Sequence, residues 1–506
     1  MDFNFSKIGF NRIDKAFEGS AEQSIDAEIT LPDYYPEVSK IHCCNAFAVI
    51  SNRQCVNESI SIGGQVNLNV IYSDSDGRVN LFATAVPFNK SVQASVNVDG
   101  MSVEVTPKIN YINHKAVAPR KLEIHGSATL GLVCEDIKKE EILTETDDPD
   151  VYLKSEDFEC LEPLVPITKM VYVEDDISVG SQPAIDKILR TDYYVTVSEC
   201  KFVNGKAVLK GDLDVTVVYL CADGHCHKLV RRQGFSQIIE CDGTNENTVC
   251  RATAAVVSFE TRVKSSNEGE NRLVGFEAKV ETKLECWNKR EFNAVCDAFS
   301  GKCRIEADFK KLPVVKKIET STESFICSKN FELPESGGNI IDSFATVGNK
   351  YSAVDDGKLV VKGELNISTL YETVSGETAF YVKPIDFDYR CELSEDFSGV
   401  ASASVRVIGL NLFGGNGGEV SAEVEIEVTV LLKETGEMTV LESISRLDSE
   451  CSKMEEDTAV VLYFAENESV WDVAKMYGVD PKMVCKLNNE PTLDAKCNKI
   501  LLVPNC

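Results

Sequence analysis

Soft metal ligands cluster at one place in the chain, where Cys221, His225, Cys226 and His227 lie close together in sequence. Zinc prefers such ligands, but structural zinc sites usually take closely spaced pairs such as Cys-x2-Cys from two separate elements. The sequence contains no Cys-x2-Cys pair. The segment His42-Cys43-Cys44 is expected to pack at the edge of a strand. The sequence therefore predicts no metal site.

Residues that could support catalysis are equally sparse. The glycine-rich loop Gly414–Gly418 lacks the Lys-Ser/Thr of a phosphate-binding loop, and an alternating segment rather than a helix follows it. The chain has 5 histidines, and none stands near a nucleophile in a recognisable catalytic pattern. Carboxylates are abundant, but none can be paired across a cleft. We therefore expect a protein that is not an enzyme and holds no cofactor.

A spaced set of four residues recurs three times: a glycine, a tyrosine, a second glycine and a phenylalanine, with identical internal spacing. Its copies begin 147 and 152 residues apart, which is too far for a solenoid and suits separate domains. The anchors are Gly64, Tyr72, Gly77 and Phe88 in the first copy, Gly211, Tyr219, Gly224 and Phe235 in the second, and Gly363, Tyr371, Gly376 and Phe387 in the third.

The segment between the first glycine and the tyrosine alternates between apolar and polar residues in each copy. In the second copy Leu213, Val215 and Val217 alternate with polar residues, which is typical of a half-buried strand. The second glycine falls in a turn sequence, so each copy contains a hairpin. Because the tyrosines and phenylalanines recur at the same place in every copy, we expect them to be core residues.

The chain is therefore predicted to be mainly β, with three tandem antiparallel domains of sandwich or barrel type. We place these domains at residues 20–135, 165–290 and 315–440. Upstream of the strand, Pro36 and Ile41 match Pro183 and Ile188 in spacing, whereas the third copy keeps Ile340 and shifts its proline by one position.

The carboxy-terminal part, residues 459–506, has a different pattern. A short strand at 462–465 is followed by Ser469 as an N-cap and by a helix over 470–477 that Gly478 ends. Asp480 caps a second helix that begins at Pro481, and a last strand covers 499–504. The predicted order is strand, helix, helix, strand.

This βααβ segment resembles a LysM domain, and the match includes Trp471, Ala474, Tyr477-Gly478-Val479 and Leu487-Asn488. The resemblance implies binding through two loops, which in LysM domains hold N-acetylglucosamine-containing glycans. Here the usual Gly-Asp-Thr is Asn467-Glu468-Ser469, and the usual Pro-Gly-Gln turn is replaced by 495–499. The residues we expect to contact a partner or a glycan are Asn467, Glu468, Ser469, Val470, Asn488, Asn489, Glu490 and Leu493.

The β repeats, read together with this module, resemble the SPOCS domain of endospore-coat morphogenesis proteins of clostridia-like Firmicutes. The residues that carry the likeness are the Pro-x4-Ile pair and the strand that runs from the anchor glycine to the tyrosine, most clearly from Lys210-Gly211 and Lys362-Gly363. Tandem SPOCS repeats followed by one LysM domain imply a coat-assembly protein that binds the ATPase scaffold around the forespore, or other coat proteins. That resemblance places the protein in the mother-cell cytoplasm and on the forespore surface.

Composition limits the partners. A formal net charge of -29 argues against nucleic acid and against an anionic membrane surface. No apolar run is long enough for a membrane span, and the first residues lack the apolar core of a secretory signal. The 19 cysteines show no framework spacing, so we expect reduced thiols, with late cross-linking in the coat through exposed thiols such as Cys497 or Cys506 as a hypothesis.

The sequence therefore favours a non-enzymatic spore-coat assembly protein that docks to a coat scaffold through its LysM domain. The alternative is a protein that binds peptidoglycan of the cortex or cell wall through the same two loops.

Overall fold

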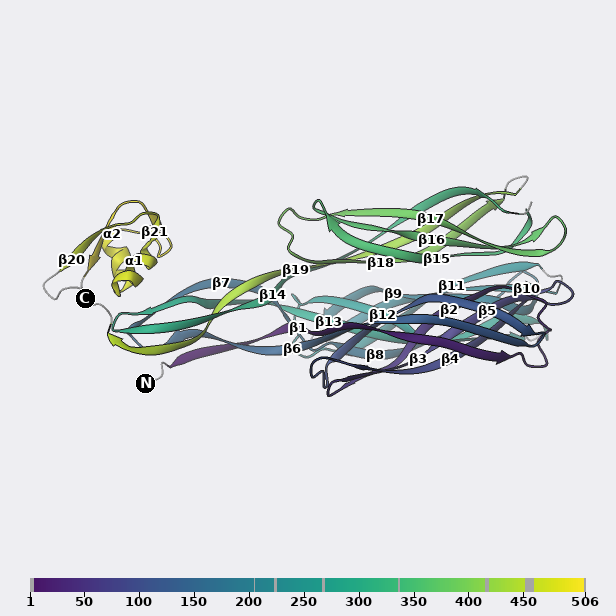
Figure 1. Cartoon of the computed structure of the whole chain (residues 1–506), viewed down its shortest axis with the longest axis horizontal. Coiled ribbons are helices and arrows are strands. Elements are labelled where there is room, and N and C mark those ends of the chain that lie inside the picture. Colours follow the sequence, from purple (N-terminus) through teal and green to yellow (C-terminus); the bar gives the residue numbers. More distant parts are fainter. Residues whose placement is uncertain are drawn as a thin grey trace.

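The computed structural model describes residues 4–203, 205–222, 225–265, 269–334, 337–414, 418–450 and 459–504. The described part is mainly β, as the sequence predicts, and all its strand pairs are antiparallel. Three repeats of long strands lie side by side over half of the molecule, and a small helical module lies at the other end (Figure 1).

The first repeat is a sandwich of two three-stranded sheets, with strand orders β1-β6-β5 and β2-β3-β4. One apolar core fills the space between the two sheets. The strands of this repeat are β1 (Phe5–Thr30), β2 (Lys40–Val56), β3 (Ser59–Ser73), β4 (Val79–Gln93), β5 (Ser102–Ala118) and β6 (Lys121–Thr146).

The second repeat has the same plan, with the long first strand replaced by two shorter ones. Strands β7 and β8 pair with the two halves of β13, β12 pairs along its other edge, and β10 lies between β9 and β11 in the second sheet. The strands are β7 (Val151–Pro163), β8 (Ile167–Ser178), β9 (Ile185–Val203), β10 (Lys206–Cys221), β11 (Cys226–Glu240), β12 (Val249–Ser265) and β13 (Asn271–Ser300).

The third repeat returns to the plan of the first, with sheet orders β14-β19-β18 and β15-β16-β17 around a core of its own. The strands are β14 (Cys303–Glu332), β15 (Gly337–Asp355), β16 (Lys358–Thr373), β17 (Thr378–Glu392), β18 (Gly399–Gly414) and β19 (Glu419–Glu450).

The glycine and phenylalanine anchors form one cross-strand pair in every repeat. Gly211 lies opposite Phe235 in the register of β10 and β11, and the other two copies place the same pair in the same way. A Cβ atom on Gly211 would lie 2.3 Å from the Thr196 carbonyl oxygen and 2.4 Å from the Phe235 ring. The aromatic ring therefore covers a position where no side chain fits, which explains why both residues recur at this spacing.

The tyrosine anchor explains the Pro-x4-Ile pair. Tyr72 donates a hydrogen bond from its hydroxyl to the Pro36 carbonyl oxygen at 3.1 Å, and Tyr219 does the same with Pro183 at 3.1 Å. The isoleucine of each motif lies directly opposite the tyrosine in the sheet, as Ile41 does opposite Tyr72. All three tyrosines and all three phenylalanines are buried, so the prediction that they are core residues is confirmed. Gly224 lies outside the described residues.

Each repeat sends a two-stranded ribbon out of its sandwich, and the three ribbons together form a stalk (Figure 1). Residues 5–15 of β1 pair with 135–146 of β6, β7 pairs with 287–300 of β13, and 303–315 of β14 pair with 435–450 of β19. A bulge between Lys15 and Phe17, another between Val315 and Lys317, and the break between β7 and β8 mark where ribbon and sandwich meet. Bulges bend strands, so they let each ribbon leave its sheet at an angle.

The stalk has an apolar core that all three ribbons share. No ribbon alone could bury it, since a two-stranded sheet has no second layer. Its residues are Phe10, Ile142, Cys160, Phe292, Ala294, Leu312, Val314, Met438 and Val440. Glu140 of the first ribbon also accepts hydrogen bonds from Arg12 and from Lys310 of the third ribbon, each at 2.9 Å.

The sandwiches meet a second time, around one structurally equivalent position in each repeat. Cys43, Arg190 and Asp342 each follow a bulge next to the anchor tyrosine, and apolar neighbours from all three copies pack together beside them. Arg190 donates from Nε and Nη2 to the two Asp342 carboxylate oxygens at 2.8 and 2.9 Å, and both side chains are buried. A buried ion pair therefore joins the second repeat to the third, and a thiol holds the same place in the first. We call this cluster the junction.

The C-terminal module is a small unit with two helices. Strand β20 pairs with β23, β21 pairs with β22, and the helices pack against the inner face of the β20–β23 sheet. Its elements are β20 (Val460–Phe464), β21 (Glu468–Ser469), α1 (Val470–Tyr477), α2 (Pro481–Asn488), β22 (Lys496–Cys497) and β23 (Ile500–Pro504).

Candidate functional site

The C-terminal module is held together by local capping. The Ser469 hydroxyl accepts from the Asp472 backbone N–H at 3.1 Å, while Asp472 accepts from the Ser469 backbone N–H at 3.0 Å. This reciprocal arrangement is a capping box. Burial alone would raise the pKa of Asp472, but the hydrogen bonds from Ser469 outweigh it and lower the pKa. Gly478 ends α1 with a left-handed φ of 66°.

The first predicted loop lies at the start of α1, and most of its polar groups already have partners inside the module. The exposed Asn467 has φ 60°, and its backbone N–H donates to the Asn498 side chain at 2.9 Å. Glu468 accepts from the Tyr463 hydroxyl at 2.8 Å, and this hydrogen bond raises the pKa of Tyr463. Ser469 and Val470 are buried, so these two predicted residues build the module rather than its surface.

The second predicted loop follows α2 and adjoins the first. The Asn488 amide bonds the backbone N–H and carbonyl of Leu502 at 2.7 and 2.8 Å, which fastens α2 to β23. Asn489 ends α2 in a left-handed conformation, and Glu490 forms an ion pair with Lys499. The Leu493 carbonyl accepts the Trp471 backbone N–H at 3.0 Å. This last bond brings the two predicted loops together.

The outer face of the β20–β23 sheet is apolar, a feature that sequence reasoning missed. Leu462 lies opposite Leu502 and Phe464 opposite Ile500 in the register. The exposed side chains of this apolar face are Val460 at 45%, Leu462 at 68%, Phe464 at 57%, Ile500 at 58% and Leu502 at 37%. The signal was present in the sequence, because both alternating sets of residues in 460–464 are apolar although only one set can face the helices.

The module contacts the far end of the stalk through Trp471, which is 1% exposed. Its ring packs edge-on against Phe299 of β13 at 5.0 Å between centroids. Its Nε1 donates to the Asp297 carboxylate at 2.7 Å, and Lys475 donates to the other oxygen of that carboxylate at 2.6 Å. The sequence left open whether Trp471 is exposed or packed, and the structure shows it packed between module and stalk.

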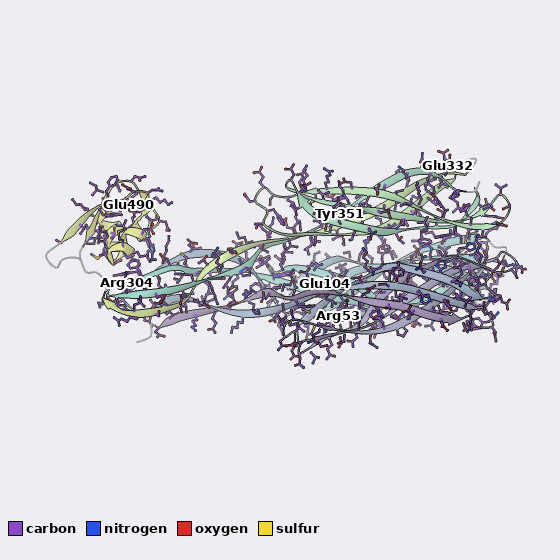
Figure 2. All side chains as sticks on the ribbon, in the orientation of Figure 1. Arg53, Glu104, Arg304, Glu332, Tyr351 and Glu490 are labelled. Atoms are coloured by element: carbon purple, nitrogen blue, oxygen red, sulfur yellow. The ribbon has the colours of Figure 1, made fainter. Side chains whose placement is uncertain are left out.

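Two further contacts complete this attachment. Lys154 of β7 forms an ion pair with Asp494. A Cβ atom on Gly301 would lie 2.9 Å from the Gly478 carbonyl oxygen, so the backbones of stalk and module nearly touch there. Figure 2 shows Arg304 at the same end of the stalk, beside the module that carries Glu490, whereas Glu332, at the other end of β14, lies at the opposite end of the molecule.

The soft-ligand cluster shows no metal-binding arrangement within the described residues. Cys221 donates from Sγ to the His225 carbonyl oxygen at 3.1 Å, and His227 stacks on Tyr219 with 5.5 Å between ring centroids. In the described ranges, no three His, Cys, Asp or Glu residues are placed to share a metal ion.

One thiol expected to be exposed is buried. Cys497 is 4% exposed because it packs in the core of the C-terminal module, so it cannot take part in surface cross-linking as hypothesised. Cys506 and residues 415–417 of the glycine-rich loop lie outside the described residues. No described helix is long and apolar enough to cross a membrane.

A comparison with known families finds a match in two of the three repeats. Residues 37–117 and 184–264 match the family described as SipL, SPOCS domain. These segments begin next to Pro36 and Pro183 and include the anchor glycine, tyrosine and phenylalanine of the first and second repeats. No curated protein and no solved structure matches the chain. The family match indicates a sporulation-related role.

Proposed function

We propose that this chain is a non-enzymatic assembly protein of the endospore coat, and that its C-terminal module is a LysM domain that docks onto a coat scaffold protein. In this proposal the protein is made in the mother cell and acts on the forespore surface. The scaffold ATPase of the coat is the expected partner. The three sandwiches would present surfaces to other coat proteins.

The observation that carries this proposal is the apolar outer face of β20–β23. An exposed apolar patch of neighbouring side chains is typical of a surface that a protein partner covers. Leu462 and Phe464 project from one strand and Ile500 and Leu502 from its partner, so four large side chains are adjacent. The docking surface would thus combine this face with the exposed residues of the two predicted loops, Asn467 and Asn489.

The stalk separates the C-terminal module, as the docking head of this proposal, from the three sandwiches. Strand β14 has 30 residues, which at ~3.3 Å per residue extends about 100 Å. The strand runs from the end that carries the module to the far edge of the third sandwich (Figures 1 and 2). A head bound to a scaffold would therefore hold the three sandwiches well away from that scaffold.

The alternative, peptidoglycan binding, uses the same two loops in a different way. Glycan recognition needs loop amides that are free to bond acetamido groups. Here the Asn488 amide is engaged with Leu502, and the Asn467 backbone N–H is engaged with Asn498. These internal bonds favour protein docking, because a bound glycan would have to replace them at a free-energy cost.

A co-sedimentation test with the full chain would distinguish the two candidates. The protein is offered the purified coat scaffold ATPase in one tube and purified peptidoglycan in the other. The informative variant is Leu462→Glu, and its matched control is Ile238→Glu, because the two side chains are 68% and 66% exposed on strands. A third variant, Glu468→Gln with Asn489→Ala, probes the two loops.

We expect capture by the scaffold alone, lost in Leu462→Glu and kept in Ile238→Glu. If only the loop variant lost capture by the scaffold, the docking surface would consist of the two loops and not of the apolar face. Capture only by peptidoglycan would overturn the proposal in favour of a cortex- or wall-binding protein.

A further inference from the structure

Four cysteines gather at one end of the second sandwich and contact the same apolar core. They come from different strands: Cys200 from β9, Cys250 from β12, Cys286 from β13, and Cys241 from the residue after β11. Cys241 and Cys286 are buried, whereas Cys200 and Cys250 are half-buried. Solvent therefore reaches only the last two.

Cys200 and Cys250 belong to different sheets whose edge strands lie against each other. Tyr193 of β9 stacks on Phe259 of β12 with 4.1 Å between centroids, which fixes one point of contact between these strands. Further along β9 and back along β12, Cys200 and Cys250 lie close enough that each thiol is the main influence on the pKa of the other. From the first point of contact to the second, β9 runs forward along the chain and β12 runs backward, so the two edge strands lie in opposite directions. The two sulfur atoms lie at this edge of the sandwich.

The fold itself does not require this pair. Cys200 lies opposite Leu209, two residues before the anchor glycine, and the same register position holds Arg53 in the first repeat and Ser352 in the third. Arg53 forms an ion pair with Glu281 across the boundary between repeats, so that position serves another purpose there. The thiol pair is thus particular to the second repeat.

We propose that Cys200 and Cys250 form an oxidation site, at which a peroxide converts the two thiols into a disulfide that joins the two sheets of the second sandwich. The Cys250 thiolate attacks one peroxide oxygen, the O–O bond breaks, and one water leaves, which gives a sulfenic acid on Cys250. The Cys200 sulfur then attacks the Cys250 sulfur and expels a second water. Two thiols and one hydrogen peroxide thus yield one disulfide and two waters.

The order of these two steps follows from the contact between the thiols. The interaction between the two thiols lowers the pKa of Cys250 and raises that of Cys200. Because the thiolate is the nucleophile, Cys250 reacts first and Cys200 resolves the product.

The neighbouring thiols provide internal controls. Cys286 lies directly opposite Cys250 in the sheet, but burial raises its pKa to about 12 and keeps it a thiol. Cys55 and Cys134 of the first repeat also contact each other, yet both are buried in the core. If proximity alone were sufficient, these pairs would oxidise as readily as Cys200 and Cys250.

The test treats the folded full-length protein with dilute hydrogen peroxide, blocks the remaining thiols with an alkylating reagent, and maps disulfides by mass spectrometry. Trypsin releases Cys200 within residues 191–201, but it leaves Cys241 and Cys250 in one peptide, residues 233–251. Cleavage before Asp242 separates these two. We expect a linked Cys200–Cys250 peptide that a reductant reverses, with Cys55 and Cys134 still alkylated.

Single variants test the order of the steps. Cys200→Ser should leave a sulfenic acid on Cys250, which a dimedone probe labels, whereas Cys250→Ser should abolish both the linkage and the label. Cys286→Ser should keep the linkage. A Cys250–Cys286 linkage, or oxidation of Cys55 and Cys134 at the same rate, would overturn the proposal, as would a Cys250 that stays reduced.

Discussion

The three repeats meet at two places, and the two meeting places differ in chemistry. In the stalk, each ribbon depends on the other two to bury a shared apolar core, and the contacts of Glu140 with Arg12 and Lys310 lie in the same ribbons. At the junction, the three repeats place a thiol, a guanidinium and a carboxylate, Cys43, Arg190 and Asp342, at one equivalent position. Apolar contact is non-directional, whereas a bidentate ion pair requires one particular partner.

Because of this difference, we expect the stalk and the junction to contribute differently to the fold. The apolar core of the stalk does not by itself select one arrangement of three similar ribbons, because apolar contact is non-directional. The pair of Arg190 and Asp342 stabilises only the arrangement in which the second repeat faces the third. We infer that the stalk supplies stability and that the junction specifies the order of the repeats, a use of buried polar groups known from coiled coils.

The largest effect is expected from breaking the junction pair on one side. Arg190→Met leaves the Asp342 carboxylate buried without its partner, which should cost about 4 kcal/mol of unfolding free energy. The double variant Arg190→Met with Asp342→Leu should recover most of that loss, since both charges are gone. Urea unfolding of the single and double variants measures this difference. A double variant as unstable as the single one would show that the pair does not act as a unit.

The next prediction concerns the stalk. Phe10→Ala removes a ring that is 1% exposed in the shared core and should cost about 3 kcal/mol. Hydrogen exchange should rise in all three ribbons, because none has a core of its own. The matched change Phe276→Ala, in the core of the second sandwich, should raise exchange in that sandwich alone. Exchange confined to the first ribbon in Phe10→Ala would contradict a shared core.

A third change tests a single repeat away from both meeting places. Gly211→Ala puts a Cβ atom 2.3 Å from the Thr196 carbonyl oxygen, a backbone atom that cannot move freely, and should cost about 2 kcal/mol. Gly234→Ala is the control on the adjacent strand, since its nearest atom would lie 3.6 Å away. Thermal unfolding of the two variants provides the comparison, and equal midpoints would show that the anchor glycine is not selected by this close approach.

The sequence was sufficient for the hairpin of each repeat because its residues recur. The spacing of Gly211, Tyr219 and Phe235 predicts a strand, a turn and a second strand, and the structure places all three in one hairpin. The ribbons, in which 5–15 pair with 135–146, 151–163 with 287–300 and 303–315 with 435–450, carry no such recurring residues. Each ribbon buries its apolar residues only against two ribbons that are distant in sequence, so no local pattern shows that these residues are buried. Phe10 and Val440 therefore could not be assigned to a core from the sequence.

The candidate site divides in the same way. Local rules predicted the caps Ser469 and Asp480 and hence the helices. They could not predict that Trp471 would bond Asp297, because that contact joins residues 174 positions apart. The apolar outer face of β20–β23 was readable in 460–464, but a short apolar strand fits a buried position equally well.

A fourth prediction concerns pH and the junction, where the first repeat differs from the other two. His42 is buried at the bulge beside Cys43, and its Nε2 bonds the Ser73 hydroxyl at 2.6 Å. Its Nδ1 is buried and has no partner among the described residues. Burial, with a smaller contribution from the charge on Lys40, lowers the pKa of His42 to about 4.

Because the folded pKa of His42 lies below the unfolded value of about 6.5, the folded state binds fewer protons than the unfolded state between these two values. His42 therefore costs no stability above about pH 7 and destabilises the fold as the pH falls towards about 4, by about 2 kcal/mol between pH 7.5 and 5. His42→Leu introduces the residue that the second repeat holds at this bulge, Leu189. The loss of unfolding free energy between pH 7.5 and 5 should be smaller in the variant by that amount. A contribution from His114, whose pKa is also lowered by burial, remains in both proteins. Urea unfolding of both proteins at the two pH values measures this difference. If both proteins lost the same unfolding free energy between pH 7.5 and 5, His42 would be solvated or protonated in the folded state. The first repeat would then meet the others differently from the arrangement described.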